Sequence, residues 1–201
     1  MIKLASNVWK FSGFSNVYLL ISENKGKILI DSGDARDGKE LLDALKKISI
    51  DAQDIDIIIF THLHYDHLGN YRLFKNAELY ASAKELKTLR ENPYGTVLNK
   101  GLAEELNEKM RLRKISIKDA SEISSRIPEI KIINTPGHTS GSICIFYERY
   151  EAEKILFSGD TLFNGCHGRT DLPTSVESEI KKSLNRLTKY DYRILCAGHD
   201  Y

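Results

Sequence analysis

Short apolar runs in the first third of the chain predict β-strands. Two of them, Val17–Ile21 and Lys27–Asp31, are separated by a Glu-Asn-Lys-Gly turn, which is typical of a β-hairpin. A third run, Ile55–Phe60, consists mostly of branched apolar residues and predicts a buried strand. Between the hairpin and this strand, helical spacing predicts a helix that begins at Lys39, with these residues on its buried face: Leu41, Leu42, Leu45 and Ile48.

The last third of the chain shows a similar mixture of patterns. Four further apolar runs predict strands, the second and third of them joined by a polar hairpin: Ile130–Asn134, Ser142–Tyr147, Lys154–Ser158 and Arg193–Ala197. Thr174 and Glu177 are spaced as in a capping box, which predicts the start of a helix. The apolar residues of that helix share one face: Val176, Ile180, Leu184 and Leu187.

The middle of the chain, Ser82–Arg126, is charged and mostly helical in pattern, with one interruption at Pro93 and Gly95. We interpret it as a helical excursion on the surface of a single domain that spans residues 1–201. The alternation of strands and helices along the chain predicts an α/β (α+β) protein. In this prediction two β-sheets are covered by helices on the outside.

Composition and charge exclude several classes of protein. With 29 Lys and Arg against 28 Asp and Glu, the formal net charge is +1, which argues against a nucleic-acid partner held by phosphate contacts. No apolar run reaches about 18 residues, so neither a transmembrane helix nor a membrane partner is expected. The N-terminus has no apolar signal core, and the three cysteines are too widely spaced for a disulfide framework. We therefore expect a reduced, cytoplasmic protein.

Four side chains of metal-ligand type follow the strand Ile55–Phe60 within six residues: His62, His64, Asp66 and His67. Imidazole and carboxylate groups suit divalent metals such as zinc. Residues two apart on an extended segment point the same way, so His62 and His64 can bind one ion. Asp66 and His67 are adjacent, so they diverge and can reach a second ion. One loop cannot complete two coordination spheres, and further ligands must come from elsewhere.

Three other candidate ligands each follow a glycine close to the end of a predicted strand: His138, Asp160 and His199. Glycine lets the backbone turn tightly and direct the next side chain. With the four residues of the loop, these three make a set large enough for two metal ions.

This set, a Thr-His-Leu-His-Tyr-Asp-His motif followed by the three separate ligands, resembles the metallo-β-lactamase fold superfamily. The resemblance covers nearly the whole chain, from Leu29 to the final Gly-His-Asp segment. It implies an αββα sandwich of two mixed β-sheets flanked by helices. It also implies that Asp31 corresponds to a family aspartate that supports the ligands, as such outer partners orient imidazole rings.

The resemblance assigns each ligand to a place in a dinuclear centre. The first site would comprise His62, His64 and His138. The second would comprise Asp66, His67 and His199. Asp160 would bridge the two ions, which would be zinc, with iron or manganese as alternatives.

The same resemblance implies a metal-dependent hydrolase in which a hydroxide that bridges the ions attacks a carbonyl carbon. Asp66 would act as the catalytic residue that orients this hydroxide. A thiolate is a good leaving group that needs little protonation, so a small-molecule thioester suits the site.

The segment Ser158–Pro173 (SGDTLFNGCHGRTDLP) is similar to the glyoxalase II-like branch and especially to its short single-domain members. This similarity implies hydrolysis of hydroxyacylglutathione. The sequence ends two residues after His199, without the helical domain with which longer glyoxalases II help bind glutathione. Two alternatives stay open. One is an iron oxidoreductase similar to persulfide dioxygenases, with iron on His62, His138 and Asp160; the other is a lactonase.

Three residues are candidates for contact with substrate, and each has a plainer alternative. Arg169 can bind a substrate carboxylate through its planar fork, or it can pair with Asp171 and shape its own loop. Tyr65 contacts substrate or packs within the motif. His167 lines the mouth of the site or is an ordinary surface residue.

Overall fold

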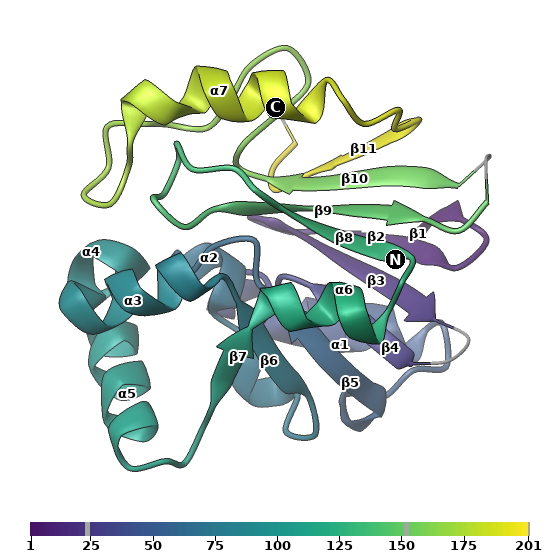
Figure 1. Ribbon diagram of the computed structural model, residues 1–201. Helices are drawn as coiled ribbons and strands as arrows, with labels where there is room; N and C mark the ends of the chain where they lie inside the picture. Colours follow the sequence, from purple (N-terminus) through teal and green to yellow (C-terminus); the bar gives the residue numbers. More distant parts are fainter. Residues whose placement is uncertain (23–24, 151–152, 201) are drawn as a thin grey trace.

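The computed structural model describes residues 1–22, 25–150 and 153–200. Two β-sheets pack face to face, and helices cover their outer faces (Figure 1). In the view of Figure 1, α7 (Glu177–Leu187) lies above the smaller sheet. Helix α1 (Gly38–Lys46) packs on the outer face of the larger sheet through Leu41 and Leu45. The fold is therefore the αββα sandwich that the sequence predicts.

The larger sheet has seven strands in chain order, and its first half is antiparallel while its second half, from β4 onward, is parallel. Its strands are β1 (Ile2–Ala5), β2 (Val8–Ser12), β3 (Asn16–Ser22), β4 (Gly26–Ile30), β5 (Ile55–Ile59), β6 (Glu78–Ala81) and β7 (Ile117–Asp119). The smaller sheet has the order β11-β10-β9-β8, with β10 and β11 parallel. Its strands are β8 (Ile130–Asn134), β9 (Ile143–Glu148), β10 (Lys154–Gly159) and β11 (Ile194–Ala197).

Helices fill the outer layers, except that α6 (Ile123–Arg126) packs Ile123 into the core between the sheets. The remaining α-helices are α2 (Tyr65–Leu68), α3 (Ala83–Glu91), α4 (Pro93–Val97) and α5 (Lys100–Arg111). Short 3-10 turns occupy Ala35–Asp37, Ala52–Asp54, Tyr71–Leu73 and Ala120–Glu122.

Alternation along the strands divides the apolar core into layers. On β3, Tyr18 and Leu20 point into the space between the sheets, whereas Val17 and Leu19 point outward under the helices. Successive side chains of a strand face opposite sides, so one strand serves both layers. A third, smaller cluster joins the outer face of the small sheet to α7 through Leu187.

The charged middle segment is mostly helical, and it also contains one strand that its pattern does not predict. Residues 82–126 contain the short strand β7 as well as helices, and Leu86, Leu102 and Leu106 are buried in the main core, so α3 and α5 form part of the outer layer. A three-residue strand between charged stretches is too short to show a period of two. The strands β1, β2 and β6 were likewise not predicted.

The capping box predicted at Thr174 and Glu177 is wrong. Helix α7 begins at Glu177, its N-cap is Val176, and no side chain caps it. Thr174 lies two residues before this N-cap, in a loop, and its carbonyl oxygen accepts a hydrogen bond from the backbone N–H of Ser140. The two predicted hairpin turns, near residues 23–26 and 149–153, fall partly outside the described residues.

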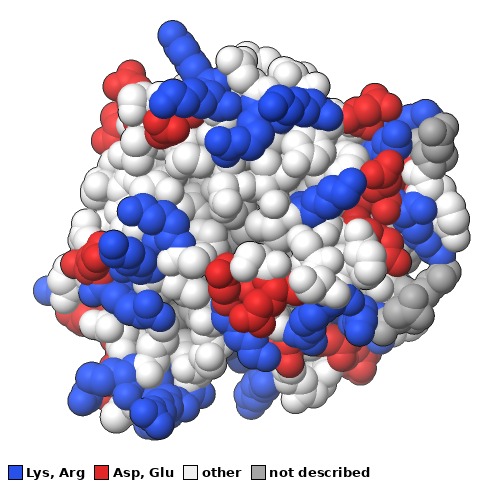
Figure 2. Space-filling view, in the orientation of Figure 1, with Lys and Arg blue, Asp and Glu red and all other residues white. Residues whose placement is uncertain are grey.

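Figure 2 shows basic and acidic side chains next to one another over the face of Figure 1, in keeping with a formal net charge of +1. Among the described residues, none of the helices has the length and apolar content needed to cross a lipid bilayer.

Candidate metal centre

The candidate ligands gather where strands of both sheets end. The larger sheet contributes the loop after β5, which carries His62, and the smaller sheet contributes Asp160 and His199, directly after β10 and two residues after β11. In α/β proteins, binding and catalytic residues commonly lie at the carboxyl ends of parallel strands. The other ligands lie on the same loop, on α2 and in the turn between β8 and β9: His64, Asp66, His67 and His138.

The ligand atoms form three overlapping groups, within each of which the atoms lie no more than 4.8 Å apart. The groups are His62, His64 and His138; His62, His67 and Asp160; and Asp66, His67 and His199. The first and third coincide with the two sites that the resemblance assigns. The middle group shares one histidine with each of the others. The structure thus brings all seven predicted ligands together, with Asp160 between the two sites.

Distances around Asp160 agree with this central position. Its Oδ2 lies 3.5 Å from Nε2 of His138 and 3.5 Å from Nε2 of His199, and its Oδ1 lies 3.4 Å from Nε2 of His67. Nε2 of His199 is also 3.3 Å from Oδ2 of Asp66. One carboxylate therefore faces histidines of both sites.

The donor set fits divalent metal ions. Among the described residues, four buried side-chain atoms of the candidate ligand residues have no hydrogen-bond partner: Nε2 of His62, His64 and His67, and Oδ1 of Asp160. Buried polar atoms without a partner are costly, and they are rare unless water, an ion or a ligand satisfies them. Nitrogen and oxygen donors directed at common points are what a zinc-like ion requires.

Electrostatics keep the first site in the protonation state that a metal needs, since a histidine ligand must be neutral. Burial, reinforced by His67, holds the pKa of His62 well below its usual range, and burial with His138 lowers the pKa of His64 to about 3. The second site differs because carboxylates lie next to its histidines. There burial opposes protonation of His199, but hydrogen bonds to Asp160 and Asp66 outweigh it and raise the pKa of His199 to about 9.

Asp31, the residue directly after β4, supports the ligands. Its Oδ2 accepts a hydrogen bond from Nδ1 of His67 at 2.9 Å, which leaves Nε2 of that ring for an ion. It also accepts from the backbone N–H and the hydroxyl of Thr61, and the Thr61 hydroxyl lies 3.1 Å from Nδ1 of His62. Asp31 thus reaches one ligand directly and another through Thr61. Its left-handed φ of 61° is a conformation that aspartate tolerates better than most residues.

A sequence profile described as Metallo-beta-lactamase superfamily matches residues 12–199. The chain belongs to this superfamily. Together with the His/Asp cluster, membership places the protein among the metallo-hydrolases of the superfamily, with side chains that can hold metal ions.

The chain is similar to superfamily members that are described as different kinds of hydrolase. A probable metallo-hydrolase of Methanocaldococcus jannaschii is 35% identical over 190 residues, which cover 90% of this chain and 85% of that protein. A hydroxyacylglutathione hydrolase of Citrobacter koseri is 31% identical over 198 residues, covering 97% of this chain and 66% of that protein. The crystal structure of BLEG-1, a B3 metallo-beta-lactamase, aligns with a TM-score of 0.67 and 26% identity over 96% of this chain and 92% of that one.

A further solved structure, of a protein crystallised in a di-iron-bound form, has a TM-score of 0.70 at 23% identity, over 96% of this chain and 91% of that one. At this identity the likeness shows the shared metallo-β-lactamase fold.

A pocket of about 510 Å³ opens beside the candidate ligands of this metallo-β-lactamase fold. All three residues predicted to contact substrate line it, namely Tyr65, His167 and Arg169. The guanidinium of Arg169 makes two hydrogen bonds with the carboxylate of Asp171, at 2.9 and 2.8 Å, and both side chains are exposed. The remaining wall is largely apolar: Phe14, Leu98, Phe163 and Leu172.

Sequence reasoning missed several residues that support the centre. Backbone carbonyl groups of Phe14 and Arg169 accept hydrogen bonds from Nδ1 of His199 and His138, at 2.7 and 2.8 Å. Any residue can supply a backbone carbonyl group, so contacts of this kind give no signal in the amino-acid sequence. Glu85 was also missed: its carboxylate bonds to Leu63 and Thr139 beside the ligands, whereas its capping-box spacing from Ser82 indicates only the start of a helix.

Proposed function

We propose that the protein is a dinuclear metallohydrolase that cleaves thioesters of the hydroxyacylglutathione type. The observation that carries the proposal is the set of three overlapping ligand groups beside an open pocket. Two ions bound there would lower the pKa of a coordinated water towards neutrality and polarise the substrate carbonyl.

The residues of the chain divide the remaining work. Asp66 borders the pocket, and its Oδ2 contacts Nε2 of His199, so its carboxylate can orient a water molecule and accept a proton from it. Hydrogen bonds from outside the centre fix the ligand rings before any substrate arrives. An acidic side chain is not required for the leaving group, since a thiol with a pKa of about 8.5 leaves as the thiolate.

The pocket walls support a substrate with an apolar part near the reacting carbonyl. Phe14 and Phe163 each make an edge-on ring contact with His199, and Leu98 and Leu172 complete the apolar wall. Because the fork of Arg169 is already occupied by Asp171, a substrate carboxylate at this point would exchange with that ion pair. The similarity to a hydroxyacylglutathione hydrolase that is 31% identical supports the choice of thioester.

The alternatives use the same site in other ways. An iron oxidoreductase would need only His62, His138 and Asp160, whereas the overlapping groups engage all seven side chains, and this favours the hydrolase. A lactonase shares the attack on a carbonyl and differs only in the leaving group.

The experiment is thiol release from S-lactoylglutathione by purified, zinc-loaded protein. We expect turnover that a chelator abolishes and zinc restores. Asp160→Asn should lower kcat/KM by about 100-fold or more, since loss of an outer partner of a ligand alone costs 10–100-fold. Asp56→Asn, at the opposite end of β5, is the matched control and should leave kcat/KM unchanged.

Two results would overturn parts of this proposal. Near-normal turnover by metal-replete Asp160→Asn would exclude a bridging role for that carboxylate. Metal-replete wild-type protein without thiol release would remove the thioester substrate. Lactone hydrolysis and persulfide-dependent oxygen uptake by iron-loaded protein would then decide between the alternatives.

A further inference from the structure

Glu85 is a buried carboxylate that the proposed reaction does not use. It lies in the first turn of α3, and its side chain is 1% exposed. Ser82 caps the helix by accepting a hydrogen bond from the backbone N–H of Glu85, so half of a capping box is present. In the other half, the glutamate would return to the backbone of Ser82. Here the carboxylate is directed elsewhere.

Each oxygen of the carboxylate bonds to a different ligand-bearing loop. Oε1 accepts a hydrogen bond from the backbone N–H of Leu63 at 3.0 Å, and Leu63 lies between His62 and His64. Oε2 accepts from the hydroxyl of Thr139 at 2.9 Å, and Thr139 directly follows His138. All three ligands of the first site are therefore one residue away from a bond to Glu85.

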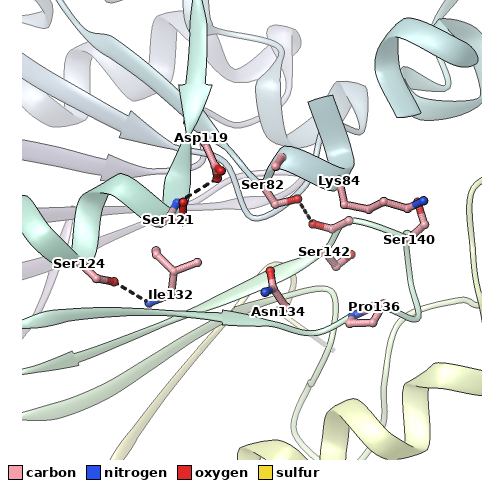
Figure 3. A pocket seen from close by; sticks show the side chains of 12 residues that line it. Ser82, Lys84, Asp119, Ser121, Ser124, Ile132, Asn134, Pro136, Ser140 and Ser142 are labelled. Carbon is pink, nitrogen blue, oxygen red and sulfur yellow. Dashed lines mark hydrogen bonds between the residues drawn. The ribbon is translucent and has the colours of Figure 1, made fainter. Parts of the chain in front are cut away.

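The two loops belong to different sheets. Leu63 follows β5 of the larger sheet, and Thr139 lies between β8 and β9 of the smaller one. Near Glu85 the sheets are separated by a pocket of about 410 Å³ whose walls come from both of them (Figure 3). The Ser82 hydroxyl donates a hydrogen bond to the carbonyl oxygen of Gly141, which is the dashed line that starts at Ser82 in Figure 3. The start of helix α3 is thus hydrogen-bonded to the turn that carries His138.

Packing leaves little freedom at this junction. A Cβ atom on Gly141 would lie 2.4 Å from the backbone nitrogen of Glu85 and 2.5 Å from its Oε2, so the turn lies directly against the glutamate. The Leu63 and Thr139 donors are uncharged. A buried carboxylate that has no charge partner is expensive unless its hydrogen bonds compensate, and an apolar side chain would fill the space at lower cost. The glutamate therefore suits a role that needs two acceptors in fixed positions.

We propose that Glu85 is a positioning residue that sets the distance between His138 and the His62–His64 pair and thereby assembles the first metal site. The inference rests on the metal centre proposed above but is independent of the thioester substrate. The ligands of the second site, Asp66, His67 and His199, lie three or more residues from Leu63 and Thr139, so we expect the metal affinity of that site to depend less on Glu85.

The test measures metal affinity without substrate. Co²⁺ is titrated against a competing chelator in a His199→Ala background, which reports the first site, and in a His64→Ala background, which reports the second. The absorption bands of bound Co²⁺ report the geometry of its ligands. In the first background, Glu85→Gln should weaken Co²⁺ binding about 10-fold and Glu85→Ala about 100-fold, with altered bands, because outer partners of ligands contribute 10–100-fold in affinity.

Thr139 variants test the same contact from the other side with a smaller change. Thr139→Val removes the hydroxyl that bonds to Glu85 and should weaken the first site about 10-fold, whereas Thr139→Ser keeps the hydroxyl and should restore the affinity. These variants, with Glu85→Gln, decide the question if Glu85→Ala does not fold.

Leu86→Ala is the matched control for loss of stability. Leu86 is the next residue of α3 and is buried in the core, so this variant should lower Tm without changing Co²⁺ affinity or absorption at either site. The proposal is wrong if the Glu85 and Thr139 variants bind Co²⁺ at the first site as tightly as the parent. It is equally wrong if they weaken both sites alike.

Discussion

Four histidines of the candidate centre have one ring nitrogen engaged outside it, and the partner of His62 is the Thr61 hydroxyl. His67, His138 and His199 each donate from Nδ1 to an oxygen that can only accept: a carboxylate oxygen of Asp31, or a backbone carbonyl oxygen. In each ring this fixes the tautomer and leaves Nε2 for the centre. A neutral imidazole with one nitrogen already oriented loses less freedom when it binds an ion. The chemistry of the centre thus depends on residues that are not ligands.

At the scale of one residue, Glu85 predicts a pH dependence of stability. Burial raises the pKa of Glu85 to about 6 from an ordinary value of 4.5, although its hydrogen bonds oppose the shift. Between these values the folded protein holds the proton more tightly than the unfolded chain. The stabilisation from protonated Glu85 is therefore complete below pH 4.5 and is lost as the pH rises through about 6.

Urea unfolding of metal-free protein between pH 4 and 8 measures this effect against Glu85→Gln, which cannot titrate. The free energy of unfolding of the wild type relative to that of the variant should fall by about 2 kcal/mol over this range, since each pKa unit corresponds to about 1.4 kcal/mol. Leu86→Ala, compared in the same way, should show a difference that does not depend on pH. A constant difference for Glu85→Gln as well would contradict the shifted pKa.

At the scale of elements, the ligands lie at the ends of strands. Gly159, at the end of β10, shows how the backbone conformation at such an end brings a ligand into place. Gly159 has a left-handed φ of 49°, and a Cβ atom there would lie 2.5 Å from the hydroxyl oxygen of Thr61. That hydroxyl connects Asp31 to His62. The glycine therefore allows β10 to approach the ligand loop of the other sheet, with Asp160 next in the chain.

Gly159→Ala should lower the free energy of unfolding by about 3 kcal/mol, the sum of the left-handed backbone and overpacking against Thr61. Activity should fall as well, because Asp160 is displaced. Gly165→Ala is the matched control: its φ of 92° is also positive, but a Cβ atom there meets nothing within 4 Å. It should cost only about 1 kcal/mol. Equal losses in urea unfolding of the two variants would rule out the contact with Thr61.

The elements that the sequence predicted are those with long apolar runs or a clear helical period, such as β5, β9 and α1. Short strands such as β7, with three residues, have too few positions to show a pattern. The same division applies to the site. The type and spacing of the ligands could be read directly, whereas the roles of Thr61 and Glu85 depend on which loops the fold brings together. The Ser-x-x-Glu spacing at Ser82 is visible in the sequence, but it does not show that the carboxylate of Glu85 bonds to residues outside the helix.

At the scale of the whole molecule, the candidate centre lies between the two sheets and takes ligands from both. Four ligands follow β5 of the larger sheet, and three follow strands of the smaller one: His62, His64, Asp66 and His67 in the first case, and His138, Asp160 and His199 in the second. Ions bound there would connect the two halves of the sandwich in Figure 1 at the end where the strands terminate. Metal binding should therefore stabilise the packing of one sheet on the other as well as the local loops.

This arrangement predicts that Tm depends on metal. An ion that binds only the folded state adds about 2.7 kcal/mol at a concentration 100 times its Kd. For a chain of this length, that corresponds to a rise in Tm of about 5–10 °C. Calorimetry of chelator-treated protein, with and without added zinc, measures the shift. His64→Ala, which takes one ligand from the first site, should reduce the shift, whereas Asp56→Asn should keep it in full. A Tm that zinc leaves unchanged in the wild type would mean that the gathered side chains do not bind the ion, because binding to the folded state alone must raise Tm.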